Sequence, residues 1–596
     1  MKKRLLAFFL ALGILLSGCT VAGPAPTTVP TETTQATTEA TQATTEATQP
    51  TAPTEPEITH PALKFDELEY VHPDLDALNA KIDEAIAMAS ESGKEAELLN
   101  LYQEIQDDYV NYSTMATLAS IHNYLDLQDE YYEQEYLDLD AAGTKLDNRL
   151  NDLTGAILDS EYADAARSAW GEDYVERYEF HSKLNSKFIE TLSEREQALV
   201  TEYNKLLTKE YTTTLDGEEV TIDDLDLTTE EGALAYYDIL ERKNSDLGRI
   251  YCKLVQIRAK IATTLGYKNY TDYAYDNLGR DFTKEDAKNF SKQVKETLVP
   301  LFSRWLETYR EDMLAASGET DVSVADGVPY LREALQAEFP AEMDEALSYM
   351  LDSGLYCFDD GENMMQAGFT TYMEGFHAPY LFINTGAYTD ASTLFHEFGH
   401  YYNFYRMGDV GWNDDQSLDL AEIHSQGLEL LMFDRYSEIY GDQADVMMLS
   451  TMFNILSAIL SGCAEDEFQQ KVYANPDMTL DQMNLVHGQI YQEYFGYPSY
   501  FEWVDIHHHF EQPLYYISYA TSAVSALEIW EIAQTDRESA LETYEQISGC
   551  TINIDYRDAL NQAGLSDPFT TDLVERVAAA LENWEMTGLN QTDNAA

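Results

Sequence analysis

The sequence predicts a mostly α-helical protein with a few short strands. Apolar residues recur at spacings of three and four along one face from Leu75 to Ala89, and similar patterns run through residues 95–208. Strand-like alternation is short, as at residues 380–384, which fit the edge of a sheet where an extended peptide can bind. The pair Asp216–Gly217 is typical of a two-residue hairpin turn. These three observations favour a helical fold over a sheet-based one.

The N-terminus predicts export. A basic start, Met1 to Arg4, is followed by an apolar run from Leu5 to Leu16, which is too short to span a membrane. The residues Leu-Ser-Gly-Cys that end at Cys19 resemble the bacterial lipoprotein cleavage box. We therefore expect residues 1–18 to be a lipoprotein signal peptide and the mature chain to begin with a lipid on Cys19. The expected location is extracytoplasmic, anchored to the bacterial cell membrane through this lipid only.

The segment that follows has the composition of a flexible tether. Residues 19–60 are rich in Thr, Pro, Ala, Gln and Glu, which cannot together bury a core. About forty flexible residues span roughly 35 Å root-mean-square, so the tether would hold the rest of the chain off the membrane. The remaining sequence divides near residue 185, into an N-terminal helical region at 61–185 and a catalytic region at 186–590.

Composition narrows the range of partners. The net charge is −71, from 36 basic and 107 acidic residues, which argues against nucleic-acid binding. Four cysteines besides Cys19 show no zinc-ligand spacing, and both free thiols and disulfides suit Cys252, Cys357, Cys463 and Cys550. The sequence does not predict an oligomeric state.

The segment from Asp390 to Tyr405 predicts a helix that carries a metal-binding motif. Asp390 or Ser392 can cap its start, and apolar and aromatic residues follow at helical spacing. His396 and His400 are four residues apart and therefore lie on one face, where both imidazoles can bind one metal ion. Glu397 follows the first His and can polarise a water at that ion. This H-E-x-x-H pattern is typical of zinc hydrolases.

Such a zinc site needs a third protein ligand and an open fourth position. A second helical pattern begins a short distance downstream, at residues 418–431. A helix packed across the first is the simplest way to deliver the ligand. Chemistry alone leaves Glu422, His424 and Glu429 possible.

These two segments resemble the catalytic core of the thimet oligopeptidase and oligoendopeptidase F family of zinc metallopeptidases. That family has H-E-x-G-H followed by a pattern like E-x-x-S-Q-x-x-E, which is filled here by Glu422, Ser425, Gln426 and Glu429. Further segments are similar to the family at residues 260–275, 280–286, 378–386 and 509–521. One departure is Asn403, where the family often has another His that is not a metal ligand.

The resemblance implies a fold and a set of residue roles. The fold would be a helical ellipsoid with a deep substrate channel, a zincin-type core and a few short strands. One Zn²⁺ per chain would be bound by His396, His400 and Glu422, and Glu397 would act as the general base. Further residues would support the metal ligands or act on the substrate. Glu429 and Asp390 are expected to support the ligands, and His509, Tyr515, Tyr516 and Tyr519 to bind substrate or stabilise the oxyanion.

The sequence thus predicts a zinc-dependent endopeptidase that hydrolyses internal bonds of short oligopeptides outside the cytoplasm. The alternative is a surface lipoprotein that binds peptides without cleaving them. A base beside a metal, as at Glu397, speaks against that alternative because a binding protein does not need one. A zinc peptidase of the thermolysin type would also use a downstream Glu, but the residues around Glu422 fit it less well.

Overall fold

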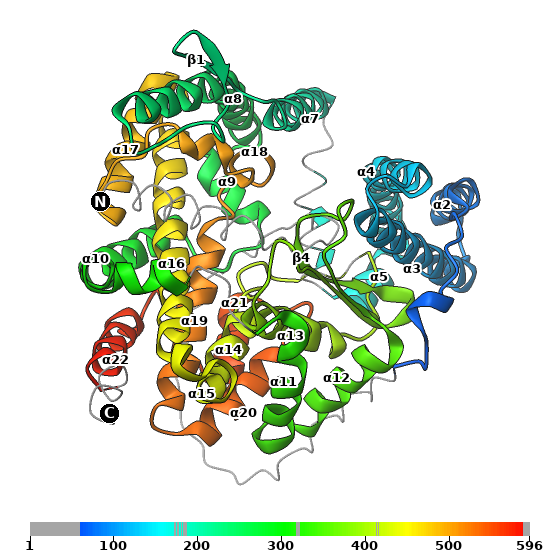
Figure 1. Ribbon diagram of the computed structural model, residues 1–596. Coiled ribbons are helices and arrows are strands. Elements are labelled where there is room, and N and C mark those ends of the chain that lie inside the picture. Colours follow the sequence, from blue (N-terminus) through cyan, green and yellow to red (C-terminus); the bar gives the residue numbers. More distant parts are fainter. Residues whose placement is uncertain are drawn as a thin grey trace, which may run out of the picture.

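The computed structural model describes residues 60–171, 174–175, 178–179, 182, 187–316, 322–412, 414 and 416–587. The predicted signal peptide at 1–18, Cys19 and all but the last residue of the predicted tether at 19–60 lie outside these residues. The described chain is mostly helical with a few short strands, which confirms the predicted fold class (Figure 1).

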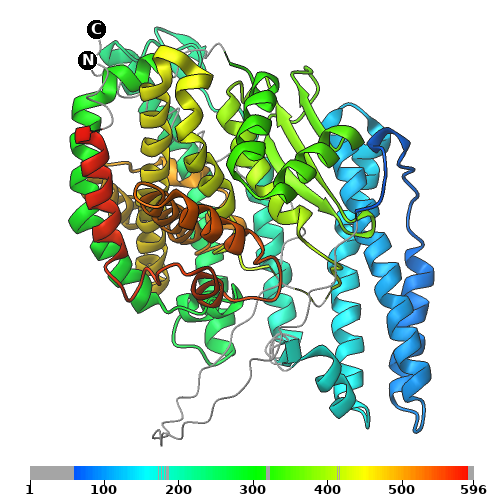
Figure 2. The same ribbon diagram turned by 90° about the horizontal axis from the view of Figure 1, so that it is seen from below.

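The N-terminal helices form a small bundle with its own core. Its elements are η1 (Phe65–Glu67), α2 (Leu75–Ala89), α3 (Glu95–Leu125), α4 (Glu130–Leu158) and α5 (Ala163–Trp170). The apolar face predicted for the first helix is buried, with Leu78, Ile82 and Ala85 among the core residues of the bundle. Helix α3 also contacts strand β4 and the turn η3, so the bundle stands next to the sheet (Figure 2).

A three-stranded sheet lies between this bundle and the large helical body. Its elements are β3 (Tyr356–Asp359), β4 (Gly368–Met373), η3 (Glu374–Phe376) and β5 (Ala378–Asn384). The strand order is β3-β5-β4, with β3 parallel and β4 antiparallel to β5. The prediction that residues 380–384 form a sheet edge is therefore wrong, because β5 is the central strand. All seven of its residues are buried, and burial on both faces blurs the alternation that distinguishes an edge from a centre.

Strands β3 and β4 form the two edges of this sheet, and β4 is the edge beside helix α13. Asn384 N donates to Ala367 O at 2.9 Å, which makes Ala367 and Asn384 a hydrogen-bonded pair of the ladder. Because such pairs alternate in an antiparallel ladder, Gly368, Thr370 and Tyr372 direct their backbone N–H and C=O groups away from β5. These groups are the ones an added strand would pair with.

The hairpin predicted at Asp216–Gly217 is present. Strand β1 (Thr213–Leu215) pairs antiparallel with β2 (Glu218–Val220). Both turn residues have positive φ, 53° at Asp216 and 88° at Gly217, as a type I′ turn requires. The hairpin connects two helices of the large body.

The large helical body contains most of the buried apolar side chains. Its helices before the sheet are α7 (Lys187–Leu207), α8 (Glu230–Thr264), α9 (Tyr270–Asn277), α10 (Lys284–Ala316), α11 (Val324–Glu338) and α12 (Ala341–Ser353). Those after the sheet are α13 (Ala391–Tyr405), α14 (Ile423–Leu431), η4 (Met432–Arg435), α15 (Tyr436–Tyr440), η5 (Gly441–Gln443), α16 (Ala444–Ala474), α17 (Leu480–Phe495), η6 (Glu502–Asp505), α18 (His508–Glu511), α19 (Ile517–Ala533), α20 (Arg537–Ser548), α21 (Tyr556–Ala563) and α22 (Leu573–Thr587).

Helix α16 is central, packed against both α10 and α19. Among the described residues, the stretch Ile423–Ala474 is long and apolar enough to cross a membrane, with a mean hydropathy of 1.7. However, 78% of its most apolar window is buried inside the protein, as expected for a core helix. The cysteines Cys252, Cys357, Cys463 and Cys550 are all free thiols in this body and the adjoining strand.

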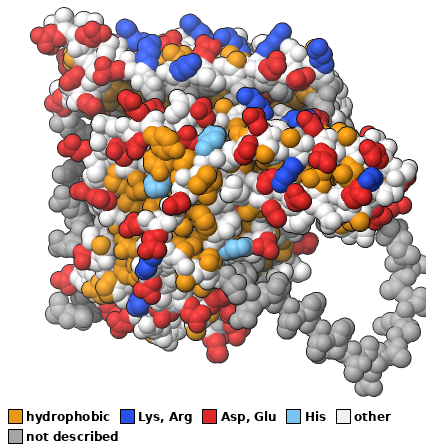
Figure 3. Space-filling view, turned by 90° about the vertical axis from the view of Figure 1, so that its right-hand side faces the viewer, with side chains coloured by type: hydrophobic (Ala, Val, Ile, Leu, Met, Phe, Trp, Pro, Cys, Tyr) orange, Lys and Arg blue, Asp and Glu red, His pale blue; other side chains and the backbone are white. Residues whose placement is uncertain are grey.

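The surface is acidic but not uniformly so. On the face drawn in Figure 3, Asp and Glu are spread over almost the whole surface. Lys and Arg gather mainly along its upper edge, at the height where Figure 1 shows α7 and α8. The middle of this face is mainly hydrophobic and includes several His side chains (Figure 3).

Candidate metal centre

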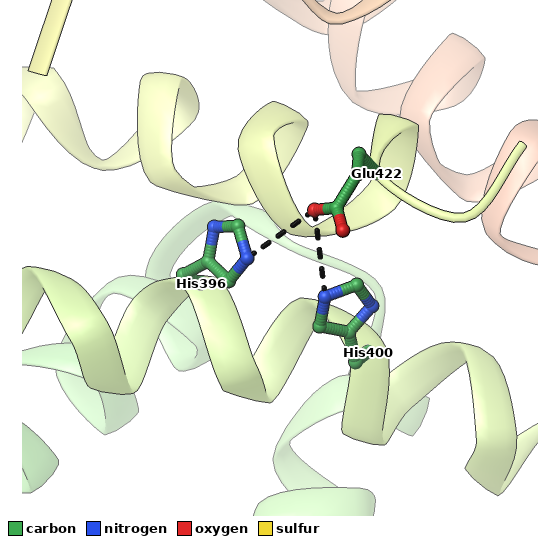
Figure 4. A group of neighbouring side chains, drawn as sticks. All are labelled: His396, His400 and Glu422. Atoms are coloured by element: carbon green, nitrogen blue, oxygen red, sulfur yellow. Dashed lines mark ion pairs between the residues drawn. The ribbon is translucent and has the colours of Figure 1, made fainter. Parts of the chain in front are cut away.

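Helix α13 presents the two histidines of the motif. Asp390 caps the helix, its side chain accepting a hydrogen bond from Ser392 N at 2.8 Å. One face of the helix is packed into the core, and His396 and His400 project together from a neighbouring face (Figure 4). Their side chains are 13% and 7% exposed, so the site is nearly buried but reachable from one side.

The acidic residue comes from the turn that opens α14. Helices α13 and α14 pack closely at Gly399, the fourth residue of the motif. A Cβ atom at Gly399 would lie 2.5 Å from His424 O and 2.6 Å from Ser425 Cα, both backbone atoms. Only glycine permits this approach, and the approach carries Glu422 to the imidazoles. Helix α14 is held in turn by Tyr544, whose hydroxyl donates to His424 O at 3.0 Å.

Replacing Gly399 by alanine should therefore separate the two helices. We expect Gly399→Ala to lower the free energy of unfolding by about 1–3 kcal/mol, the usual cost of overpacking a core contact. It should also weaken metal binding, because Glu422 moves with α14. Urea unfolding and a metal titration measure the two effects. Gly408→Ala is the matched control, since a Cβ there meets nothing within 4 Å, and equal behaviour of the two variants would contradict the argument.

The ligand atoms converge at the spacing of a zinc site. One atom from each of His396, His400 and Glu422 lies within 4.8 Å of the others. Glu422 Oε2 is 3.3 Å from His396 Nε2 and 3.6 Å from His400 Nε2 (Figure 4). Tetrahedral zinc bonds of about 2.0–2.1 Å place neighbouring ligand atoms roughly 3.3 Å apart. Glu422 Oε1 is buried and has no hydrogen-bond partner in the protein. The donor set therefore fits a zinc ion.

The protonation states also suit a metal site. Burial lowers the pKa of His400 to about 4, so this imidazole is neutral near pH 7. Burial alone would raise the pKa of Glu422, but His400 and His396 hold it at about 2, and Glu422 is therefore ionised. Neutral imidazole and ionised carboxylate are the forms that bind metals.

Two residues contact the far sides of the imidazoles. Glu429 Oε2 lies 3.5 Å from His396 Nδ1, the position that its predicted supporting role requires. His424 Nε2 lies 3.1 Å from His400 Nδ1, so the imidazole that chemistry allowed as a third ligand instead contacts a ligand. Such partners set the tautomer and orientation of a ligating His. Asp390, predicted as another support, binds Ser392 N and the hydroxyl of Tyr440.

Glu397 lies beside the edge strand. Thr370 Oγ1 donates to Glu397 Oε2 at 3.0 Å, and a Cβ on Gly368 would lie 3.6 Å from Glu397 Oε1. Burial raises the pKa of Glu397 to about 7, against the lowering effect of His396 and Thr370. The carboxylate is thus fixed between the metal ligands and the backbone groups that β4 leaves unpaired.

The tyrosines of the late segment gather into one cluster, and the His508 ring packs against all three of them. His509 contacts the cluster at Tyr516, with 6.5 Å between the ring centroids. Tyr515, Tyr516 and Tyr519 are each only 5–6% exposed. The His508 ring stacks on Tyr515 at 5.0 Å between centroids and lies 5.5 Å and 5.9 Å from the other two. Leu418, four residues before Glu422, packs on the same cluster. The cluster therefore adjoins the segment that delivers the acidic ligand.

His509 packs mainly into the core. It is fully buried, and its Nε2 lies 3.2 Å from Glu465 Oε2. The other oxygen of Glu465 lies 3.1 Å from His487 Nε2. These contacts tie α18 to α16 and α17, so His509 has a structural environment that its spacing to Tyr515 did not reveal. Adjacent residues of a helical turn face different directions, and the sequence does not say which of three consecutive histidines faces the tyrosines.

A buried ion pair joins the tyrosine segment to the ligand segment. Arg280 Nε lies 3.4 Å from Asp419 Oδ2, and both side chains are at most 3% exposed. Arg280 also donates to Tyr515 O at 3.2 Å, and Ser518 Oγ donates to Asp419 Oδ1 at 2.7 Å. Sequence reasoning missed Asp419, although a carboxylate three residues before a candidate ligand was a signal.

The comparisons with known proteins concern the N-terminal region and the fold. A model of the peptidase M3 N-terminal domain matches residues 65–185. An X-ray structure of a protein assigned as oligoendopeptidase F is 25% identical, with a TM-score of 0.70 over 88% of this chain and 99% of that chain. Residues 65–185 thus match an M3 peptidase N-terminal domain, and the described chain has the fold of an oligoendopeptidase F structure. This confirms the family that the two motif segments resemble. No curated protein matches the chain.

Two further solved structures share the fold. PZ peptidase A, solved with an inhibitor, is 24% identical with a TM-score of 0.71, over 89% of this chain and 100% of that chain. A protein assigned as oligoendopeptidase F from Bacillus anthracis is 24% identical with a TM-score of 0.69, over 88% and 98% of the two chains. The shared fold thus extends across nearly all of the described residues.

Proposed function

We propose that this protein is a zinc-dependent endopeptidase that cleaves internal bonds of short oligopeptides outside the cytoplasm. The observation that supports this most directly is the meeting of His396, His400 and Glu422, with Glu397 beside them and the free edge of β4 alongside. When bound by these three residues, a zinc ion supplies a Lewis acid that polarises the scissile carbonyl and acidifies water.

Glu397 transfers a proton from the attacking water to the leaving peptide nitrogen. Its carboxylate accepts a proton from the attacking water as the water oxygen bonds to the carbonyl carbon. It then gives the same proton to the peptide nitrogen as the C–N bond breaks, so no other donor is needed. The hydrogen bond from Thr370 holds the carboxylate in this position.

The β4 edge orients the substrate. An extended peptide that pairs with Gly368, Thr370 and Tyr372 passes directly beside Glu397, because Gly368 and Thr370 are its neighbours. Backbone pairing makes no demand on side chains, which suits an enzyme acting on varied sequences. A peptide must be extended to pair in this way, which excludes folded proteins.

The tyrosine cluster stabilises the oxyanion that forms when water attacks the scissile carbonyl. A hydroxyl of Tyr515, Tyr516 or Tyr519 can donate a hydrogen bond to the developing negative charge. We assign the accompanying imidazole to His508, because it stacks on the cluster whereas His509 faces Glu465. The Arg280–Asp419 ion pair holds the tyrosine segment in place relative to the segment that carries Glu422.

A quenched fluorescent peptide tests the function. We expect the purified protein to cleave it, to lose activity on treatment with a chelator, and to regain activity when Zn²⁺ is returned. Removal of the metal leaves Glu397 and the peptide-binding edge in place, so binding without cleavage should persist. Cleavage that resists the chelator would exclude a metal mechanism, and binding without cleavage in the metal-loaded protein would favour the peptide-binding lipoprotein.

The proposed location rests on the first residues of the chain. If Cys19 carries a lipid, Cys19→Ser should abolish incorporation of labelled fatty acid and release the protein from the membrane fraction. The substitution lies far from the metal ligands in sequence, so peptidase activity of the released protein is the control. A variant that still partitions with the membrane would contradict the lipid anchor.

A further inference from the structure

A solvent-open cavity of about 650 Å³ lies beyond the end of β4. Three segments form its walls: residues 103–115 of α3, residues 374–377 after β4, and residues 409–411 with Asp414 after the zinc-motif helix. We call it the acidic cavity, because four of its lining residues are carboxylates: Asp107, Glu374, Asp409 and Asp414. Of the described residues that line it, none is Lys or Arg.

The negative charge in this cavity is poorly balanced. Asp107 accepts a hydrogen bond from Gln103, and Asp414 accepts from Gly411 N and Asn553, all neutral donors. Glu374 Oε2 is buried and has no hydrogen-bond partner in the protein. Burial raises the pKa of Glu374 to about 7, although a hydrogen bond with Ser113 lowers it, and the charge of Asp414 adds to the rise. His377, whose Nε2 lies 3.4 Å from Asp409 Oδ1, is the one His among the described lining residues.

The carboxylates are too widely spaced for a metal ion. In the described part of the chain, only His396, His400 and Glu422 bring three such ligand atoms within 4.8 Å of one another. Carboxylates spread around an open cavity instead suit a larger organic cation, such as an ammonium or guanidinium group on a flexible side chain.

The cavity lies in line with the peptide-binding edge. Glu374 directly follows Met373, the last residue of β4, whereas Thr370 touches Glu397. Glu374 is four positions beyond Thr370, about 13 Å along the strand direction at roughly 3.3 Å per residue. An extended peptide spans the same distance in about four residues. If it pairs antiparallel to β4, the slightly more stable arrangement, its N-terminal part points toward the cavity.

We infer that the acidic cavity is a substrate subsite for a positive charge on the N-terminal side of the scissile bond, about four residues away. The charge is a Lys or Arg side chain or the free α-amino group of a short peptide. The inference rests on the proposed function, because it assumes that the substrate lies along β4. It adds a preference for basic peptides that the metal centre does not impose.

Equilibrium binding tests this without requiring cleavage. The probes are fluorescent peptides with acetylated N-termini, identical except for one position that is Lys or the uncharged norleucine. Anisotropy is measured with the Glu397→Gln protein loaded with Zn²⁺. We expect Lys on the N-terminal side to bind about tenfold more tightly than norleucine, in the range of a charge-assisted hydrogen bond. Lys at the mirror position on the C-terminal side should give little preference.

Substitutions in the acidic cavity test whether it causes the preference for Lys over norleucine. Adding Asp107→Asn and Glu374→Gln should bring the Lys-to-norleucine ratio close to one, whereas Glu133→Gln on the exposed face of α4 should leave the ratio unchanged. If the double variant does not fold, as judged by circular dichroism, Asp107→Asn alone at its exposed position should still lower the ratio.

Equal binding of the two peptides, or a ratio that survives the cavity variants, would overturn the subsite. Equal preference for Lys on both sides of the bond would also overturn it, because the net charge of the protein would then explain the attraction. Cleavage by the wild-type enzyme is scored separately. Its absence would refute the peptidase while the binding ratio still decides the cavity.

Discussion

Glu397→Gln should reduce kcat/KM by about 10²–10⁴-fold, the usual contribution of a general base. The amide has nearly the shape of the carboxylate and can still accept the hydrogen bond from Thr370, but it cannot take a proton from water. The ligand atoms of His396, His400 and Glu422 are untouched, so the zinc content should stay at one ion per chain. Initial rates on a quenched peptide and elemental analysis of the same sample measure both quantities.

The combination of lost activity and retained metal is what identifies a base. If Glu397→Gln lost its zinc as well, the residue would have to be counted among the ligands. The same substitution at the exposed Glu133 is the control for a general effect of removing one charge. Activity within a few-fold of wild type would remove Glu397 from the mechanism.

Glu422→Gln should weaken zinc binding by at least about 100-fold, more than the 10–100-fold typical of residues that only support a ligand. It replaces the one anionic donor by a neutral amide and leaves two imidazoles, which bind a dication less strongly. Titration of the apoprotein against a chelator of known affinity measures the change. Peptidase activity should fall in parallel and recover in part at high zinc concentration.

Glu429→Gln is the informative comparison. Its carboxylate lies 3.5 Å from His396 Nδ1 and does not reach the metal position, so its loss should cost affinity only through the orientation of His396. His424→Ala should act in the same way through His400. If Glu422→Gln kept its zinc while one of these two variants lost it, the third ligand would have been assigned wrongly.

Local periodicity explains how much of the metal centre could be predicted. Residues four apart share a helical face wherever a helix forms, so His396 and His400 could be paired from spacing alone. The Asp390 cap and the Asp216–Gly217 hairpin are also local, because each depends on a few neighbouring residues. Predictions of this kind depend little on the rest of the fold.

The direction in which a side chain faces, and the neighbours of a strand in the sheet, were harder to predict from the sequence. Residues 380–384 were expected at an edge, yet β5 lies between β3 and β4 because partners on both sides come from separate segments. Spacing favoured His509, whereas we propose His508, because His508 stacks on Tyr515 while His509 lies against Glu465 and 6.5 Å from the Tyr516 ring. A shift of one residue around a helical turn reverses the environment of a side chain.

The amino-acid sequence therefore specified the chemistry of this protein: two imidazoles on one helical face, a carboxylate between them, and an apolar framework of helices to hold them. Residue chemistry alone left Glu422, His424 and Glu429 open, and the family resemblance implied Glu422. The packing of α13 on α14, which the missing side chain of Gly399 permits, is what brings Glu422 to the imidazoles. The role of β4 as the edge beside α13, and the acidic cavity at its end, likewise arise where α3, the sheet and the loop after α13 meet. Contacts between segments far apart in the chain decide these features, and no local pattern encodes them.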